Sequence, residues 1–202
     1  MENSTEKSIQ LFKFIQTLDD FQLIADSPAG YDHMGAIICD AGLQAGIKYE
    51  TVVWPRVKHV LETFPEAKTT SAFQRVLMIV GATNLLTWRL DRKINTIVDL
   101  TQLFVSEGLE TAVSLQTWLQ ESKNIERLKK IKGIGPKTAD YFKILVGLPT
   151  SAIDIHLRRF IEQAGVVVTR YEAAQDVIRE TAVLLKTDER TLDYSIWKYM
   201  AG

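Results

Sequence analysis

The stretch LKKIKGIGPKTADYF, residues 128–142, decides how this chain folds. At its centre, Gly133 and Gly135 bracket one apolar residue, Ile134, and Pro136 follows. Glycine permits backbone angles that a side chain forbids, and it lets a ligand approach the main chain closely. Proline suits the first position of a helix, where its missing N–H costs no hydrogen bond. The stretch therefore predicts a tight turn that leads directly into a helix.

A helix is expected before this turn, over residues 124–131, and another after it, over 136–146. Asn124 is the expected N-cap of the first helix. The free amides at the start of the second helix point outward and form a site for an anion. A DNA phosphate is the natural candidate, since such contacts position a duplex without reading its sequence. A plain corner between two helices is the alternative that the turn alone leaves open. The inner face of the first helix is expected to consist of Ile125, Leu128 and Ile131.

Lys137 lies in the first turn of the second helix, at the positive end of the helix macrodipole. A cation is slightly unfavourable at that end. The placement of this lysine therefore needs an explanation, which residues further along the chain supply.

Apolar residues recur at helical spacing along nearly the whole chain, which predicts an all-α fold with short connections. Only GVVVT, residues 165–169, has the composition of a strand, and it is too short and solitary to form a sheet. A short turn is expected at 83–88, and Gly147 and Gly165 are expected to end helices. The other predicted helices span residues 5–18, 33–44, 49–64, 70–80, 91–105, 111–121, 155–164, 171–185 and 188–200.

Composition and charge fit a folded protein better than a dedicated nucleic-acid-binding protein. Of the 202 residues, 46% are hydrophobic, which is enough for a core and too many for disorder. The net charge is −1, whereas nucleic-acid-binding domains are usually basic. Residues 121–143 are the exception, with seven basic and three acidic side chains around the turn. Such a run is usually a solvated face, and only its position around the turn gives it weight as a DNA contact.

Cys39, in the apolar segment GAIICDAG, is the single cysteine. One cysteine excludes a disulfide within the chain and a cysteine-rich zinc or iron–sulfur site. We expect Cys39 to be a buried small hydrophobic residue. No apolar run approaches the roughly 18 residues of a membrane span, and the first residues carry no secretory signal. A cytoplasmic protein with no membrane partner is therefore expected.

Asp154 stands in LPTSAIDIHLRRFIEQAG, residues 148–165, directly before the helix expected over 155–164. Its first role is therefore that of an N-cap. One helix and one loop separate it from Lys137, and a loop that returns beside the start of that helix brings the two side chains within reach. His156 is interpreted as structural, because no second ligand stands at helical spacing from it.

The segment IKGIGPKTADYFKILVGLPTSAIDIHLRRF, residues 131–160, resembles the helix-hairpin-helix DNA glycosylases of the endonuclease III superfamily, which carry a Gly/Pro-rich loop and an aspartate. The family pattern is approximately L-P-G-V-G-x-K-T-A, followed after one helix by V-D-x-H. This chain reads I-K-G-I-G-P-K-T-A at 131–139, with Ile134 in place of valine, and I-D-I-H at 153–156. The resemblance is looser along most of the remaining chain.

The resemblance implies two helical lobes with the DNA and the active site in the cleft between them. The inner lobe would span 30–148 and contain the helix-hairpin-helix at 124–146. The outer lobe would be formed by both termini, from residues 1–29 and 149–202.

The chemistry implied by the resemblance answers the question that Lys137 raises. Members with a lysine here extrude a damaged base; the amine then attacks the sugar C1′, displaces the base and forms a Schiff base. β-Elimination nicks the strand. Attack needs a neutral amine, which partial burial and the positive helix end both favour. Ionised Asp154 would stabilise the positive charge on the sugar, and Gly133, Ile134 and Gly135 would bind the DNA backbone.

Two further residues are assigned through looser parts of the resemblance. AIICDAGLQAG, ending at Gly46, is similar to the helix whose glutamine enters the gap left by the extruded base, which implies this role for Gln44. WRLDRKINTIVDL is similar to the segment entering the long helix before the hairpin, with Lys93 as a DNA-binding residue near the backbone. Trp54, Trp88 and Trp118 are large enough to stack on a flipped base, but packing is the expected role of each.

The sequence thus predicts a monomeric DNA glycosylase with lyase activity, acting on double-stranded DNA that carries a damaged base or an abasic site. No cofactor and no iron–sulfur cluster are expected, and the resemblance leaves room for a monovalent cation at the hairpin backbone. In a prokaryote the protein would associate with the nucleoid. A non-catalytic helix-hairpin-helix module that grips DNA is one alternative. A monofunctional glycosylase without lyase activity is the other.

Overall fold

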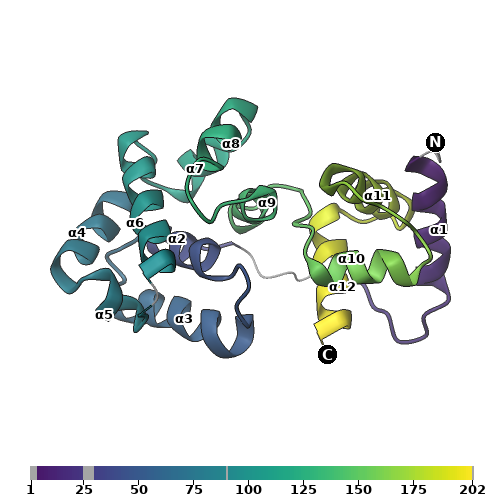
Figure 1. The fold of residues 1–202 in the computed structure, drawn as a ribbon, viewed down its shortest axis with the longest axis horizontal. Helices are drawn as coiled ribbons and strands as arrows, with labels where there is room; N and C mark the ends of the chain where they lie inside the picture. Colours follow the sequence, from purple (N-terminus) through teal and green to yellow (C-terminus); the bar gives the residue numbers. More distant parts are fainter. Residues whose placement is uncertain (1–3, 25–29, 90, 202) are drawn as a thin grey trace. The chain divides into compact units, whose positions relative to one another are not determined.

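The computed structural model describes residues 4–24, 30–89 and 91–201, and every regular element in these ranges is a helix (Figure 1). The expected all-α class is confirmed for this part of the chain, and residues 165–169 form no strand there. In chain order the elements are α1 (Ser4–Gln16), α2 (Met34–Leu43), the π-helix η1 (Tyr49–Val53), α3 (Trp54–Thr63), α4 (Thr70–Val80), α5 (Ala82–Leu86), α6 (Asp91–Ser106), α7 (Ala112–Trp118), α8 (Ser122–Leu128), α9 (Pro136–Leu145), α10 (Ile155–Gln163), α11 (Tyr171–Leu184) and α12 (Glu189–Ala201).

The chain divides into two compact units. The continuous unit is Gly30–Leu148, and the terminal unit combines Met1–Ala29 with Pro149–Gly202. Each unit has a hydrophobic core of its own.

The continuous unit is built around α2, which is apolar on all sides and buried along its whole length. Helices α3, α4, α6 and α9 pack against it. Cys39 is fully buried in this core, as expected. An apolar helix enclosed on every side fixes the position of any polar side chain that it carries, because its neighbours leave no room for movement.

In the terminal unit, α1 packs on α11 and α10 packs on α12. Phe160 of α10 is fully buried, and its ring meets Phe14, Phe21 and Tyr199 at centroid distances of 5.5 to 5.8 Å. This aromatic cluster ties α10 to both terminal segments of the chain, and α10 is the helix that Asp154 precedes.

Most helix ends follow from glycine and proline, with two corrections. Gly147 and Gly165 adopt positive φ just after α9 and α10, as expected. The prediction of Asn124 as an N-cap is wrong: Glu121 takes that position, and Asn124 is buried inside α8 with its amide donating to the Trp118 carbonyl. A turn was expected at 83–88, but Ala82–Leu86 form the short helix α5, because Leu85 and Leu86 pack in the core.

Candidate active site

The turn between α8 and α9, residues 129–135, is anchored to α6 by one threonine. The Oγ1 atom of Thr96 lies 2.9 Å from the carbonyl oxygens of both Arg92 and Lys132. Gly133 adopts a φ of +99°, and a Cβ atom at this position would lie 3.0 Å from Thr96 Oγ1. Glycine is therefore required at residue 133 both by the backbone angle and by the closeness of α6.

The turn delivers the chain into α9 with its first amides uncapped by side chains. Gly135 is the N-cap, with an extended backbone and no side chain to occupy the helix end, and Pro136 follows in the first turn, as expected. Ile134 is buried, 6% exposed, and its N–H donates to the Ile131 carbonyl. The apolar side chain of Ile134 thus holds the turn against the core. Gly133 and Gly135 on either side of it have no side chains, so the backbone of the turn stays accessible.

Lys137 lies one residue after Pro136, and its amine is brought to the end of α2. The Nζ atom donates a hydrogen bond of 2.6 Å to Oε1 of Gln44, the C-cap residue of α2. Nζ also lies 5.3 Å from the ring centroid of Tyr141, one turn further along α9. The structure therefore brings together Lys137 and Gln44, two predicted site residues 93 positions apart. The Nε2 atom of Gln44 is buried and has no hydrogen-bond partner.

A buried carboxylate lies on the same part of α2. Asp40 is 0% exposed and accepts hydrogen bonds from three tyrosine hydroxyls. Tyr31 and Tyr49 donate to its Oδ2 atom, at 2.8 and 3.1 Å, and Tyr141 donates to Oδ1 at 3.1 Å. Tyr141 thus touches both Asp40, through its hydroxyl, and the Lys137 amine, through its ring. We call Asp40 with these three tyrosines the Asp40 cluster.

Burial and hydrogen bonding act in opposite directions on the Asp40 carboxyl. Burial raises its pKa to about 6, although the three hydroxyls and the charge of Lys137 pull the pKa down. Burial and the neighbouring Asp40 charge raise the pKa of Tyr31, Tyr49 and Tyr141 above the usual tyrosine value. The tyrosines therefore stay protonated and serve as donors, and Asp40 is the group of the cluster that titrates near neutral pH.

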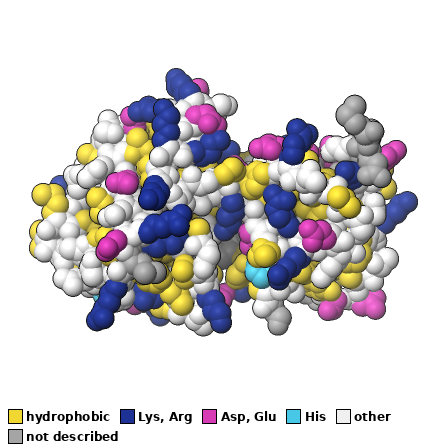
Figure 2. Space-filling view, in the orientation of Figure 1, with side chains coloured by type: hydrophobic (Ala, Val, Ile, Leu, Met, Phe, Trp, Pro, Cys, Tyr) yellow, Lys and Arg dark blue, Asp and Glu magenta, His cyan; other side chains and the backbone are white. Residues whose placement is uncertain are grey.

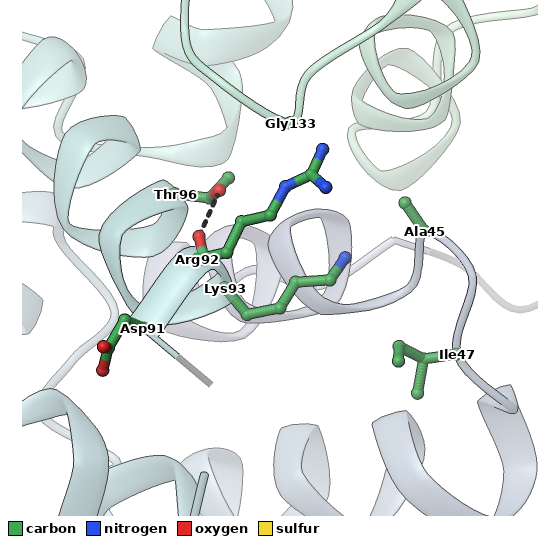
Figure 3. A pocket seen from close by; sticks show the side chains of 7 residues that line it. All are labelled: Ala45, Ile47, Asp91, Arg92, Lys93, Thr96 and Gly133. Carbon is green, nitrogen blue, oxygen red and sulfur yellow. Dashed lines mark hydrogen bonds between the residues drawn. The ribbon is translucent and has the colours of Figure 1, made fainter. Parts of the chain in front are cut away.

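Lys93 lines a pocket of about 370 Å³ that also includes Gly133 of the glycine turn (Figure 3). Its Nζ donates to the Gly42 carbonyl at 3.2 Å, and Figure 3 shows the Arg92 side chain extending toward Gly133. Burial, together with the charges of Arg92 and Lys137, lowers the pKa of Lys93 to about 8. The pocket thus presents two cations next to the glycine turn, an arrangement suited to an anion. Its lining residues are Ala45, Ile47, Asp91, Arg92, Lys93, Thr96 and Gly133.

The basic segment around the turn is partly neutralised by ion pairs. Figure 2 shows Lys and Arg side chains gathered over the region of α6 and α8. Arg127 pairs with Glu107, and Lys129 pairs with Glu126 at 2.6 Å. A further pair, at 2.8 Å, joins Lys143 to Asp140. The exposed basic side chains of the segment include Lys123, Lys130 and Lys132.

Asp154 belongs to the terminal unit and is the N-cap of α10, as expected. Its Oδ1 atom accepts hydrogen bonds from the amides of His156 and Leu157, at 2.8 and 3.0 Å. These bonds fix the carboxylate at the start of the helix. Its pairing with Lys137 stays a prediction.

Packing accounts for two of the three tryptophans. Trp88 is 9% exposed, with the Arg56 guanidinium 4.8 Å from its ring centroid. Trp118 is 8% exposed and donates its indole N–H to Glu107. Both are core residues, as expected, and Trp54 is half-buried at the start of α3.

No group of three or more potential metal ligands occurs among residues 4–24, 30–89 and 91–201. Within the same ranges, no helix has the length and apolar character that crossing a membrane requires.

The Asp40 cluster was not predicted from the sequence, although one signal of it is present. Asp40 interrupts MGAIICDAGL, a segment that is otherwise apolar and expected to be buried. A carboxylate in a buried segment requires partners, because an unpaired buried charge is costly. The identity of those partners, Tyr31, Tyr49 and Tyr141, depends on the tertiary fold.

The fold and the site define a class of protein: an all-α chain of two helical units, in which the amine of a lysine at the start of α9 meets a glutamine at the end of α2, near a buried carboxylate on α2. A family model matches residues 31–201, and the chain belongs to this family, described as a domain of unknown function, DUF8548. No curated protein and no solved structure matches the chain at a significant level.

Proposed function

We propose that the protein is a base-excision-repair DNA glycosylase with lyase activity at abasic sites. One observation carries the proposal: the Lys137 amine, in the first turn of α9 next to the glycine turn, is directed to Gln44 Oε1 at 2.6 Å. A lysine that served only to bind phosphate would extend into solvent as a mobile point charge. Here the amine is fixed by its hydrogen bond to Gln44 and lies over the ring of Tyr141. A nucleophile requires such a fixed position. The resemblance of residues 131–160 to helix-hairpin-helix glycosylases supports the same reading.

The proposed reaction uses Lys137 as the nucleophile. The neutral amine forms a bond to C1′ of the extruded nucleoside while the C1′–N bond to the base breaks. The base leaves with the bonding electron pair and takes up a proton. Loss of a proton from the amine and opening of the sugar ring give a Schiff base. Removal of a C2′ proton then expels the 3′-phosphate and nicks the strand.

The proposed DNA contacts are the backbone of the turn and the cations beside it. The amides at the start of α9 and the glycine turn would receive a phosphate oxygen. Arg92 and Lys93 line the adjoining pocket and add positive charge. Gln44 would enter the gap left by the base, which would release its oxygen from the Lys137 amine.

Asp154 would supply the negative charge that stabilises the developing positive charge on the sugar. Its capping hydrogen bonds occupy Oδ1, so the other oxygen remains to face the substrate. This assignment rests on the family pattern at residues 153–156.

The experiment is a borohydride trap. Borohydride reduces the C=N bond of a Schiff base, so it cross-links the protein covalently to duplex DNA that carries an abasic site. We expect a cross-linked species with the native chain and none with Lys137→Ala. Lys58→Ala is the matched control, since Lys58 is an exposed lysine of the same unit, 3.7 Å from Glu62. A trap that survives Lys137→Ala would exclude the lysine mechanism.

A panel of duplexes, each with one lesion, separates the alternative functions. Nicking without alkali indicates glycosylase and lyase activity, whereas nicking only after alkali indicates a monofunctional glycosylase. Duplex binding without cutting of any substrate, abasic DNA included, would mean that the protein is a non-catalytic DNA-binding module.

A further inference from the structure

Asp40 is an unusual residue for the centre of a hydrophobic core. It is fully buried on α2, and three hydrogen bonds hold its two oxygens in place. A core needs no carboxylate for its stability, and an apolar residue of similar size avoids the desolvation cost. A buried charge held by donors from three separate segments is a feature that a reaction can use.

Two residues next to Asp40, Tyr141 of the cluster and Gln44 of α2, contact the proposed nucleophile. Tyr141 donates its hydroxyl to Asp40 and presents its ring to the Lys137 amine at 5.3 Å. Gln44, one helical turn after Asp40 on α2, accepts the hydrogen bond from that amine. The charge of Lys137 is felt at Asp40, so the two groups interact electrostatically as well.

We propose that Asp40 is a positioning residue for Lys137: its buried carboxylate attracts the Lys137 ammonium, opposes the repulsion from Lys93, and so sets the pH at which the amine becomes a nucleophile. The proposal rests on the proposed function, because it assigns a role in that same reaction. No proton passes to Asp40 in this account; the carboxylate acts only through its charge.

The charged and titratable groups around this pair come from five parts of the continuous unit. The negative charge of Asp40 favours the protonated form of the Lys137 amine, and the positive charge of Lys93 favours its neutral form. The charge of Arg92 acts on Lys93. The tyrosines remain neutral donors, and burial keeps the Cys39 thiol protonated by raising its pKa. These groups are Tyr31, which precedes α2, Cys39 and Asp40 of α2, Tyr49 of η1, Arg92 and Lys93 of α6, and Lys137 and Tyr141 of α9.

The two opposing charges give the proposal a signature that a structural role does not have. Asp40→Asn removes the negative charge and keeps a polar side chain among the hydroxyls. Lys93→Met removes the positive charge and keeps most of the side-chain volume. The pH of half-maximal trapping should fall in Asp40→Asn and rise in Lys93→Met. A single nearby charge moves a titration by about half a pH unit to one unit.

The measurement is the single-turnover rate of borohydride trapping on abasic duplex between pH 5 and 9, at saturating DNA. Saturation separates the pH shift from any loss of binding in Lys93→Met. Glu126→Gln is the matched control, because it removes an exposed carboxylate of the same unit that pairs only with the distant Lys129. Shifts of the same sign in both variants, or no shift in Asp40→Asn, would overturn the proposal.

A second measurement does not depend on activity. The lysine amines of the full chain are reductively methylated with ¹³C-formaldehyde, and the Lys137 resonance is identified by its loss in Lys137→Arg. Its NMR titration midpoint should fall in Asp40→Asn and stay unchanged in Glu126→Gln. If the native protein forms no cross-link to abasic DNA but the Lys137 midpoint still falls in Asp40→Asn, the proposed function is wrong and the charge coupling stands. An unchanged midpoint would sink the role of Asp40.

Should Asp40→Asn fail to fold, Asp40→Leu replaces it, since an apolar residue of similar size avoids the desolvation cost of a buried charge. The Lys137 midpoint should again fall, because the negative charge is gone. An unchanged midpoint in a folded Asp40→Leu protein contradicts the proposal.

Discussion

Two carboxylates of this chain meet opposite environments, and their roles differ accordingly. Asp154 is half-buried and accepts amide hydrogen bonds at the start of a helix, which is a common place for a negative charge. Asp40 is enclosed in the core, and burial moves its pKa from an ordinary 3.8 to about 6. The charge of Asp40 is therefore retained at neutral pH at a cost in stability.

The cost predicts how stability depends on pH. The folded chain holds the Asp40 proton more tightly than the unfolded chain, so its stability falls as pH rises from about 4 through 6. A rise of about two pKa units corresponds to roughly 3 kcal/mol. Relative to Asp40→Asn, the native protein should therefore lose up to about that free energy of unfolding between pH 4 and 7. Urea unfolding of both proteins at pH 4.5 and 7.5 measures the difference.

The comparison uses the difference between two proteins because other carboxyls also titrate in this range. Glu126→Gln should leave the difference from the native protein nearly constant with pH, since its side chain is exposed. A difference between the native protein and Asp40→Asn that does not grow with pH would show that Asp40 carries no such penalty.

Single residues were predictable where their role is local. Asp154 as an N-cap follows from its place directly before an apolar helical pattern, and the structure has those hydrogen bonds. The partners of Asp40 stand 9, 9 and 101 residues away, and the farthest of them lies on another helix. The hydrogen bond between Gln44 and Lys137 spans 93 residues. Pairing over such separations depends on how helices pack, which periodicity does not encode.

At the scale of elements, the turn between α8 and α9 shows how a short segment is held rigid. Ile134 anchors it in the core, and Thr96 ties its backbone to α6. A turn fixed at both points presents its amides in one arrangement, which suits contact with a phosphate.

Two alanine substitutions in this turn should behave differently. Gly133→Ala forces a side chain into a φ of +99° and against Thr96, so it should cost about 1–2 kcal/mol of stability and weaken duplex binding. Gly135→Ala is the control, because its φ is −108° and nothing lies within 4 Å of its Cβ. It should cost less than about 1 kcal/mol. Thermal unfolding and fluorescence anisotropy with an abasic duplex test both; equal losses would contradict the argument.

Elements were predicted well where glycine or proline marks an end. Pro136 marks the start of α9 and Gly147 follows its end, so the observed bounds of this helix lie within one residue of the expected ones. The start of α8 was missed because Asn124 is a good N-cap by type, yet its amide reaches the Trp118 carbonyl from inside the helix. Tertiary contact overrode local preference there, as it did in α5.

At the scale of the whole molecule, the two residues proposed for the reaction belong to different units, Lys137 to the continuous unit and Asp154 to the terminal unit. The two residues differ in what their loss should do. Lys137 is half-buried with its amine hydrogen-bonded to Gln44, whereas Asp154 also stabilises the start of α10.

Two substitutions at Asp154 separate charge from capping. Asparagine caps helices as well as aspartate does, so Asp154→Asn should leave the unfolding free energy within about 0.5 kcal/mol while lowering the glycosylase rate at least tenfold. Asp154→Ala should lose both the activity and about 1 kcal/mol of stability. Single-turnover base release and urea unfolding provide the two readouts. Full activity in Asp154→Asn would confine Asp154 to capping.

The continuous unit is an insertion in the sequence of the terminal unit, and this order has a consequence for biosynthesis. A ribosome releases α1 first, at about 5–20 residues per second, then all of Gly30–Leu148, and only afterwards α11, on which α1 packs. The continuous unit can therefore form its core on the ribosome while α1 still waits for its partner.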